Sequence, residues 1–166
     1  MTNRPETMPA RPDTIDRMAG LDPGTPIYDI RAFRPEFVGG AEACRASVLE
    51  PADDLGLVRE LRAAVARRVA RSSANPAVIA GYLAPVEPSL AELAEGETPT
   101  DLRLGAIAAH ADMIAADPGR SSARDLQALL DAGLTVPQVI ALSELLAFVC
   151  FQIRVVHGLS LLKEAE

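Results

Sequence analysis

Three side chains near the C-terminus have the types and the spacing to carry out chemistry on one face of a helix. Cys150 is followed by Arg154 four residues later and by His157 seven residues later, and such intervals share a helix face. A guanidinium beside a thiol favours the thiolate, the reactive form of cysteine. A cysteine inside an apolar helix is, however, usually an inert core residue, and a histidine near a helix end can bond the last carbonyls. We favour these structural roles and keep Cys150, Arg154 and His157 as secondary catalytic candidates.

A strong helix start is found at Asn75-Pro76-Ala77-Val78. An asparagine side chain can cap the first turn, and proline fits the first helical position. The pattern predicts a helix from here to about Ala84. His110, within an alanine-rich helical segment, is expected at the surface or the core edge and not in catalysis.

Helical periodicity dominates the rest of the chain. Thr135-Val136-Pro137-Gln138 is a capping box that opens a helix of roughly 22 to 25 residues, and Gly133 ends the helix before it. An earlier segment with Phe33, Phe37, Ala41, Cys44 and Val48 is expected to form either one helix or a broken pair, with Gly39-Gly40 as the break. No segment alternates apolar and polar residues for long enough to predict a strand, so the fold class is all-α, a bundle of about six to eight helices.

The N-terminal 26 residues contain five prolines. Each proline removes a hydrogen-bond donor and restricts the residue before it, so residues 1–26 are expected to form an extended or loosely ordered arm. A short helix is conceivable only around Ile15 to Leu21. Residues 27–166 are expected to form the helical domain.

Composition limits the function classes. The 166 residues suit one domain, and a core without tryptophan and with six Phe or Tyr must consist of closely packed aliphatic helices. A net charge of −7 argues against a nucleic-acid partner and against an anionic membrane surface. The two cysteines lie far apart, so neither a disulfide framework nor a metal site is indicated, and no cofactor is predicted. The arginine-rich, lysine-poor composition fits a GC-rich bacterium.

The last helix is apolar on nearly every side but includes Glu144, Gln152 and Arg154. Charges deep in lipid are costly, so no membrane span is expected, and no secretory signal is visible; we expect a cytoplasmic protein. Such a helix is central or shared between subunits, which predicts an oligomer. Glu144 and Gln152 are expected to be buried and paired or at a subunit boundary, with Arg154 as the partner of any buried carboxylate.

The helical pattern resembles the carboxymuconolactone decarboxylase and AhpD-like alkyl hydroperoxidase superfamily, over roughly residues 35–162. The residues that carry the resemblance are Leu126, Leu129-Leu130, Ala132-Gly133-Leu134, Ile140-Ala141-Leu142, Ala147-Phe148, Phe151-Gln152-x-Arg154 and, upstream, Arg59 to Ala70. The resemblance implies an AhpD-like helical bundle that assembles as a trimer or hexamer.

Active members of that family use a Cys-x-x-Cys pair, a following His and a preceding Glu as a thiol relay. Aligned on Arg68-Val69-Ala70-Arg71, the cysteine positions fall on Asn75 and Val78, the His on Tyr82 and the Glu on Ala63. Every member of the relay is replaced, so the family's thiol peroxidase mechanism is not carried over, and the protein is a candidate pseudoenzyme. Asn75 and Val78 are expected to cap and pack the helix.

Tyr82 and Arg68 are the candidate ligand-binding residues. Tyr82 either points into the vacated pocket or lies at its edge. The cluster Arg59, Arg62, Arg67, Arg68 and Arg71 is expected to form mainly a solvated face, with Arg68 close enough to the pocket to meet an anion.

Three functions follow as hypotheses. The first is a non-peroxidase ligand-binding or interaction subunit, accompanied in the cell by an active peroxidase-related paralogue. The second is a cysteine-independent enzyme for a small carboxylated substrate, similar to the decarboxylase branch. The third is peroxidase activity relocated to Cys150.

Overall fold

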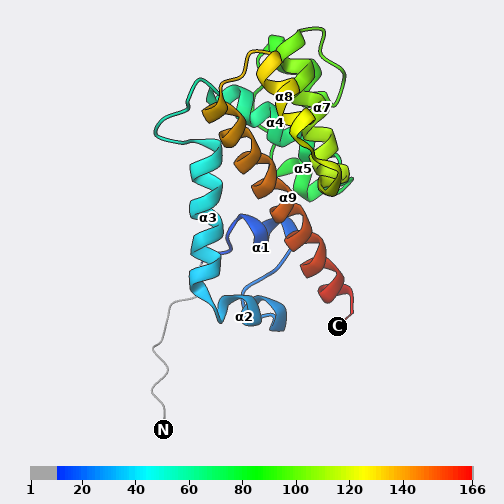
Figure 1. The fold of residues 1–166 in the computed structure, drawn as a ribbon. Helices are drawn as coiled ribbons and strands as arrows, with labels where there is room; N and C mark the ends of the chain where they lie inside the picture. Colours follow the sequence, from blue (N-terminus) through cyan, green and yellow to red (C-terminus); the bar gives the residue numbers. More distant parts are fainter. Residues whose placement is uncertain (1–10, 166) are drawn as a thin grey trace.

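The computed structural model describes residues 11–165, and this part of the chain is entirely helical (Figure 1). The α-helices are α1 (Thr14–Ala19), α2 (Pro26–Ala32), α3 (Pro35–Leu49), α4 (Arg59–Arg71), α5 (Pro76–Ala80), α6 (Ala91–Glu95), α7 (Leu102–Ala116), α8 (Ala123–Asp131) and α9 (Val136–Glu164). Two short 3-10 helices, Pro88–Leu90 and Pro118–Arg120, connect them. The all-α prediction is confirmed; the nine α-helices of the described residues exceed the six to eight expected.

Helix α9 crosses the molecule from end to end, with α4, α7 and α8 around its first half and α1 and α2 beside its second half (Figure 1). The predicted capping box is confirmed: Thr135 Oγ1 accepts from the Gln138 amide at 3.4 Å, and Gln138 Oε1 accepts from the Thr135 amide at 3.0 Å. Gly133 ends α8 with a φ of 90°, a left-handed conformation that favours glycine. At 29 residues, α9 is longer than predicted.

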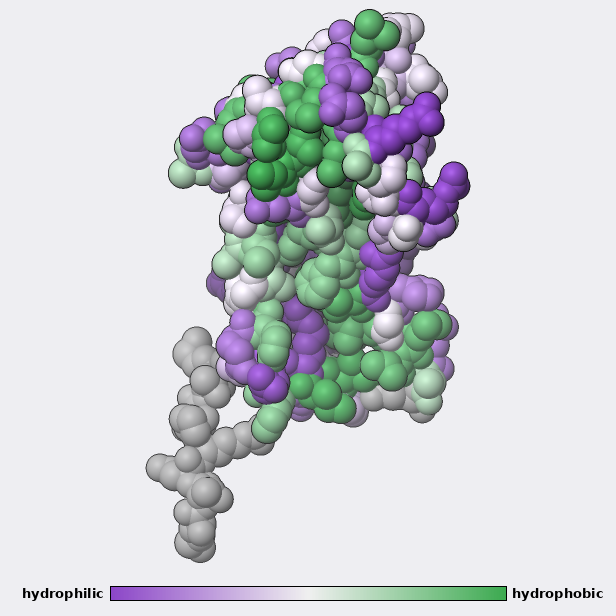
Figure 2. All heavy atoms as spheres, viewed as in Figure 1, coloured by the Kyte–Doolittle hydropathy of each residue, from purple (hydrophilic) through white to green (hydrophobic). Residues whose placement is uncertain are grey.

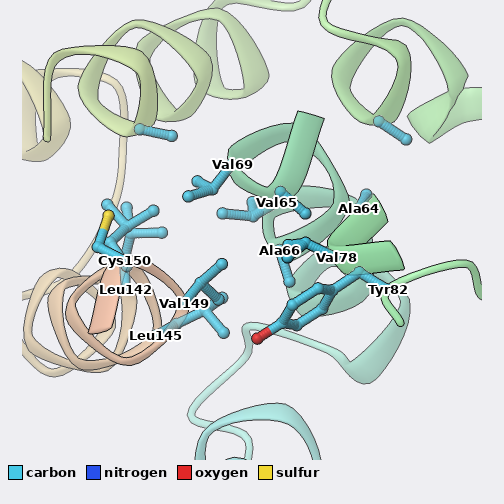
Figure 3. Packing of buried hydrophobic residues seen from close by; sticks show 14 of the residues in the cluster. Ala64, Val65, Ala66, Val69, Val78, Tyr82, Leu142, Leu145, Val149 and Cys150 are labelled. Atoms are coloured by element: carbon cyan, nitrogen blue, oxygen red, sulfur yellow. The ribbon is translucent and has the colours of Figure 1, made fainter. Parts of the chain in front are cut away.

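The core lies where α4 packs against α6 and α9. Three alanines of α4 are completely buried, which allows neighbouring helices to approach closely, and Val65 and Val69 fill the space beside them (Figure 3). The alanines are Ala64, Ala66 and Ala70.

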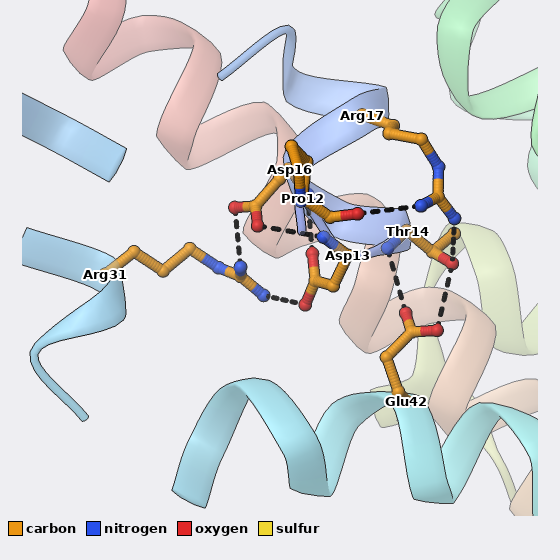
Figure 4. A network of polar contacts seen from close by, with 7 residues as sticks. All are labelled: Pro12, Asp13, Thr14, Asp16, Arg17, Arg31 and Glu42. Atoms are coloured by element: carbon orange, nitrogen blue, oxygen red, sulfur yellow. Dashed lines mark hydrogen bonds and ion pairs between the residues drawn. The ribbon is translucent and has the colours of Figure 1, made fainter. Parts of the chain in front are cut away.

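The expectation of an extended or loosely ordered arm is wrong for residues 11–26, which pack against α9 and α5 through α1. The short helix expected near Ile15 is confirmed, and the Ile15 side chain is only 1% exposed. Arg31 binds Asp13 and Asp16 at 2.6 Å each and so ties α2 to α1 (Figure 4). The prolines flank the helices and do not interrupt them, which is why the segment can order. Residues 1–10 of the predicted arm lie outside the described residues.

Of the two alternatives for this segment, the broken pair is excluded, because α3 continues through both Gly39 and Gly40. Each glycine costs a helix about 1 kcal/mol relative to alanine, which a helix of 15 residues tolerates.

Helix α9 is the one helix among residues 11–165 that is long and apolar enough to cross a membrane. In the most apolar 18-residue stretch of α9, 56% is buried inside the fold. A buried core helix of a soluble protein can be equally long and apolar, so these two properties are weak evidence for a membrane span.

Candidate functional site

Asn75 and Val78, which the resemblance aligns with the two cysteines, both have structural roles. Asn75 Oδ1 accepts hydrogen bonds from the amides of Ala77 at 2.9 Å and Val78 at 3.3 Å, so the predicted cap is confirmed. The Val78 side chain is 1% exposed and belongs to the core. Helix α5 ends at Ala80, four residues before the predicted end, because tight turns follow it.

Ala63 and Tyr82, which the resemblance aligns with the Glu and the His, line one cavity of about 160 Å³. We call it the Tyr82 cavity. Its full lining is Arg45, Leu49, Glu50, Arg59, Ala63, Gly81, Tyr82, Leu83 and Ala84. The structure therefore brings together two of the four aligned positions, with two arginines that the sequence analysis had not placed there.

Arg45 from α3 organises one wall of the Tyr82 cavity. Its guanidinium lies 4.4 Å from the centre of the Tyr82 ring and donates to the Gly81 carbonyl at 2.7 Å. It also donates to Gln152 Oε1 at 2.9 Å, and the Tyr82 hydroxyl donates to the same oxygen. Since a guanidinium can only donate, this oxygen must face it, which leaves the fully buried Gln152 Nε2 without a hydrogen-bond partner among the described residues.

Burial raises the pKa of Tyr82 to about 12, against the opposing effect of Arg45. The side chain is therefore a neutral phenol near pH 7 and a hydrogen-bond donor. It cannot serve as the proton acceptor that a histidine would supply at this position.

Arg68 is not at the Tyr82 cavity. It is buried, and it binds both carboxylate oxygens of Asp112 at 2.7 Å each. It also donates to the carbonyls of Leu93 and Glu97 at 3.2 and 2.7 Å. Its donors thus join α4 to α7 and to the segment around α6, and the cation beside Tyr82 is Arg45.

The interpretation of the α4 arginines as a solvated face is wrong for Arg68 and also for Arg62, which is 3% exposed. Arg62 donates to the carbonyls of Leu57, Val48 and Asp54 at 2.7 to 3.0 Å. These carbonyl oxygens lie at the end of a helix or in turns, where they need a hydrogen-bond donor from elsewhere. The periodicity of the sequence does not show which arginine supplies it.

A second cavity, of about 360 Å³, lies between α7 and α9; we call it the Cys150 cavity. Its lining is His110, Ile114, Pro118, Ser143, Leu146, Ala147, Cys150 and Arg154. Cys150 and Arg154 are therefore brought together as predicted. His157 is exposed and is not part of the lining.

The histidine that lines the Cys150 cavity is His110, from α7, and not His157, which was the candidate histidine near Cys150. It is 5% exposed, more buried than the surface or core-edge position expected, and its Nδ1 has no hydrogen-bond partner among the described residues. Burial lowers the pKa of His110, so the ring is neutral at pH 7.

Burial raises the pKa of the Cys150 thiol, and the nearby Arg154 guanidinium opposes this only in part. Cys150 is therefore a protonated thiol at neutral pH, and the more accessible thiol is Cys44. Glu144 is exposed, so it is not buried and paired within this chain, and a position at a subunit boundary remains the prediction for it. Gln152 is buried as expected, but it pairs with Arg45 and Tyr82.

The two cavities are separate. Their linings share no residue, and Figure 3 shows Val149 between Cys150 and the Tyr82 hydroxyl. Within residues 11–165, no group of three or more His, Cys, Asp or Glu side chains is arranged to hold a metal ion.

Comparison with models of protein families, with curated proteins and with solved structures gives no significant match to this chain.

Proposed function

We propose that this protein is an AhpD-like helical protein without a thiol relay, which acts as a ligand-binding or interaction subunit and not as a peroxidase. One observation carries the proposal: Ala63 and Tyr82 line a common cavity, while Asn75 and Val78 serve as a cap and a core residue. In this proposal the Tyr82 cavity corresponds to the family's pocket. The side chains that perform the family's thiol chemistry beside that pocket are replaced in this chain.

The ligand that best fits the Tyr82 cavity is a small anion such as a dicarboxylate. Arg45 and Arg59 lie on its wall, and the neutral Tyr82 adds no negative charge there. Arg59 is exposed and paired with Glu50 at 2.5 Å, so an incoming carboxylate can replace Glu50 at little cost.

The same ligand chemistry would serve a cysteine-independent enzyme for a carboxylated substrate. The aligned base, however, is a phenol with a pKa of about 12, and this favours binding over turnover. Peroxidase activity at Cys150 is disfavoured because that thiol is buried and protonated.

Binding is tested by the thermal unfolding midpoint with succinate. The wild type is expected to gain stability, Arg59→Gln to lose that gain, and Arg71→Gln to keep it. Arg71 is the matched control, since it is exposed and paired with Glu95 at 3.0 Å, outside the lining of the cavity. An unchanged midpoint in the wild type at 10 millimolar succinate would contradict anion binding.

The loss of peroxidase activity is tested separately, by peroxide consumption with a dithiol reductant. Wild type, Cys150→Ser and Cys44→Ser are all expected to show no turnover above buffer. Turnover that disappears only in Cys150→Ser would identify a relocated active site and would overturn the proposal.

As partners we propose other copies of this chain, in a cytoplasmic trimer or hexamer, and an active peroxidase-related paralogue. On the face drawn in Figure 2, hydrophobic atoms follow the path of α9. The exposed apolar side chains of α9 are Val136, Ile140, Phe151, Leu161 and Leu162. A surface of this kind on a central helix is typical of a subunit interface. Co-purification with a relative that has the Cys-x-x-Cys pair tests the second partner.

A further inference from the structure

The Cys150 cavity has the composition of a site for an amphiphilic molecule. Its apolar lining consists of Ile114 and Pro118, from α7 and the turn after it, and of Leu146 and Ala147 from α9. At about 360 Å³ it reaches the size range of small-molecule sites, roughly 300 to 1,000 Å³. Such sites are mostly apolar with a few polar groups that orient the ligand.

One polar atom in this cavity is buried and has no hydrogen-bond partner among the described residues. The His110 side chain is only 5% exposed, and its Nδ1 has no hydrogen-bond partner among the described residues. A buried polar atom without a hydrogen-bond partner lowers the stability of the fold by about 1–3 kcal/mol. Such an atom in a native protein needs an explanation, and a role in binding a ligand is one.

Arg154 is the second polar group of the cavity; its guanidinium is exposed and bonds the Cys150 thiol. Among the described residues no carboxylate lies within ion-pair distance of it, whereas Arg31, Arg67 and Arg68 all have one. Its guanidinium lies close enough to Cys150 to affect the thiol, which places it over the cavity and not away from it. The planar guanidinium matches a carboxylate with two parallel hydrogen bonds.

We propose that the Cys150 cavity binds a small apolar monocarboxylate, with the carboxylate on Arg154 and the hydrocarbon part against Ile114, Leu146 and Ala147. A single cation at an apolar cavity favours one negative charge on one end of the ligand. The Cys150 thiol and the His110 ring line the body of the site as neutral groups. This site is distinct from the Tyr82 cavity and does not depend on the function proposed for it.

The experiment measures the affinity of octanoate and of octanol by calorimetry and by NMR shifts of residues in the cavity. The wild type is expected to bind octanoate at least 10-fold more tightly than octanol. Arg154→Gln is expected to abolish that preference while octanol binding is retained. Arg71→Gln, at an exposed position outside the lining of both cavities, is the control and is expected to change neither affinity.

A second variant tests the hydrocarbon part of the site. Ala147 is exposed and lines the cavity, so Ala147→Phe is expected to fill it, to keep the helical circular dichroism spectrum and to lose both ligands. If that variant does not fold, Ser143→Leu fills the same cavity from one turn earlier.

Three results would overturn the proposal. The first is that His110 and Cys150 signals do not shift at 10 millimolar octanoate. The second is that octanoate binds Arg154→Gln as tightly as wild type. The third is that Arg154→Gln changes the oligomeric state and not octanoate affinity, which would assign Arg154 to a contact between copies.

Discussion

The Tyr82 hydroxyl donates a hydrogen bond to the side chain of Gln152, which lies 70 residues further along the chain. The same Gln152 oxygen accepts from Arg45, 107 residues away from it in sequence. One buried amide oxygen thus joins α3, the turn after α5 and the middle of α9. This contact fixes the wall of the Tyr82 cavity.

Removal of these donors is expected to destabilise the fold. Tyr82→Phe should lower the free energy of unfolding by about 1 kcal/mol, since Arg45 still satisfies the Gln152 oxygen. Arg45→Met should cost about 2–4 kcal/mol, because the Gly81 carbonyl and Gln152 both lose a donor. Urea denaturation measures both values. Arg34→Met is the control, as Arg34 lies 4.6 Å from the Phe37 ring on an exposed surface, and it should change stability by less than about 0.5 kcal/mol.

Gly81 is required by close packing and not by its backbone conformation. A Cβ at Gly81 would lie 1.9 Å from Met18 Cε and 3.2 Å from its sulfur. Gly81→Ala is therefore expected to cost about 1–3 kcal/mol in thermal or urea unfolding, and Met18→Ala in the same chain should recover part of it. Gly158→Ala, within α9 and with open space around the position, should be neutral or stabilising. Equal losses at Gly81 and Gly158 would contradict this account.

Arg68 is expected to govern stability and not ligand binding. Arg68→Ala should cost about 2–4 kcal/mol, mainly because it leaves the carbonyls of Leu93 and Glu97 without their donor; the ion pair with the exposed Asp112 adds little. The succinate-induced change of the thermal midpoint should persist at a temperature where the variant is folded. A loss of the succinate effect with stability intact would instead place Arg68 in the binding site.

His110 is expected to make the protein less stable in acid. Its folded-state pKa lies below the usual 6.5, so the unfolded chain takes up a proton first as the pH falls. The contribution of His110 is complete above about pH 7 and declines as the pH drops below 6.5, by at most about 1.4 kcal/mol per pH unit. Urea unfolding at pH 7, 6 and 5 should show a shallower decline for His110→Gln than for wild type. His157→Gln, at an exposed position, should leave the wild-type decline unchanged.

The exposed face of α9 is expected to hold subunits together. Ile140→Glu and Phe151→Glu place a charge on side chains that are 55% and 47% exposed, so folding should be retained while association is lost. Light scattering at micromolar concentration should give a trimer or hexamer for the wild type and monomers for both variants. Leu102→Glu, at an 87% exposed position outside α9, should remain associated. A monomeric wild type would refute the predicted assembly.

Much of the local structure could be predicted because its causes lie within a few residues. Asn75 bonds amides two and three residues later, and Thr135 and Gln138 bond each other across one turn. Such contacts depend on residue type and spacing alone. Prediction failed where packing outweighed local preference, as in residues 11–26, which were expected to be loosely ordered but pack against α9 and α5 through α1.

What the sequence by itself determined was the all-α class, the main helix caps and the absence of a thiol at the positions that the resemblance aligns with the relay. Only the tertiary structure decided which arginines are buried, which histidine lines the same cavity as Cys150, and which cation lies over the Tyr82 ring. The physical reason is sequence distance. Arg68 meets Asp112 44 residues away, and Arg45 meets Gln152 107 residues away, so these partners are chosen by how the helices pack and not by any local pattern.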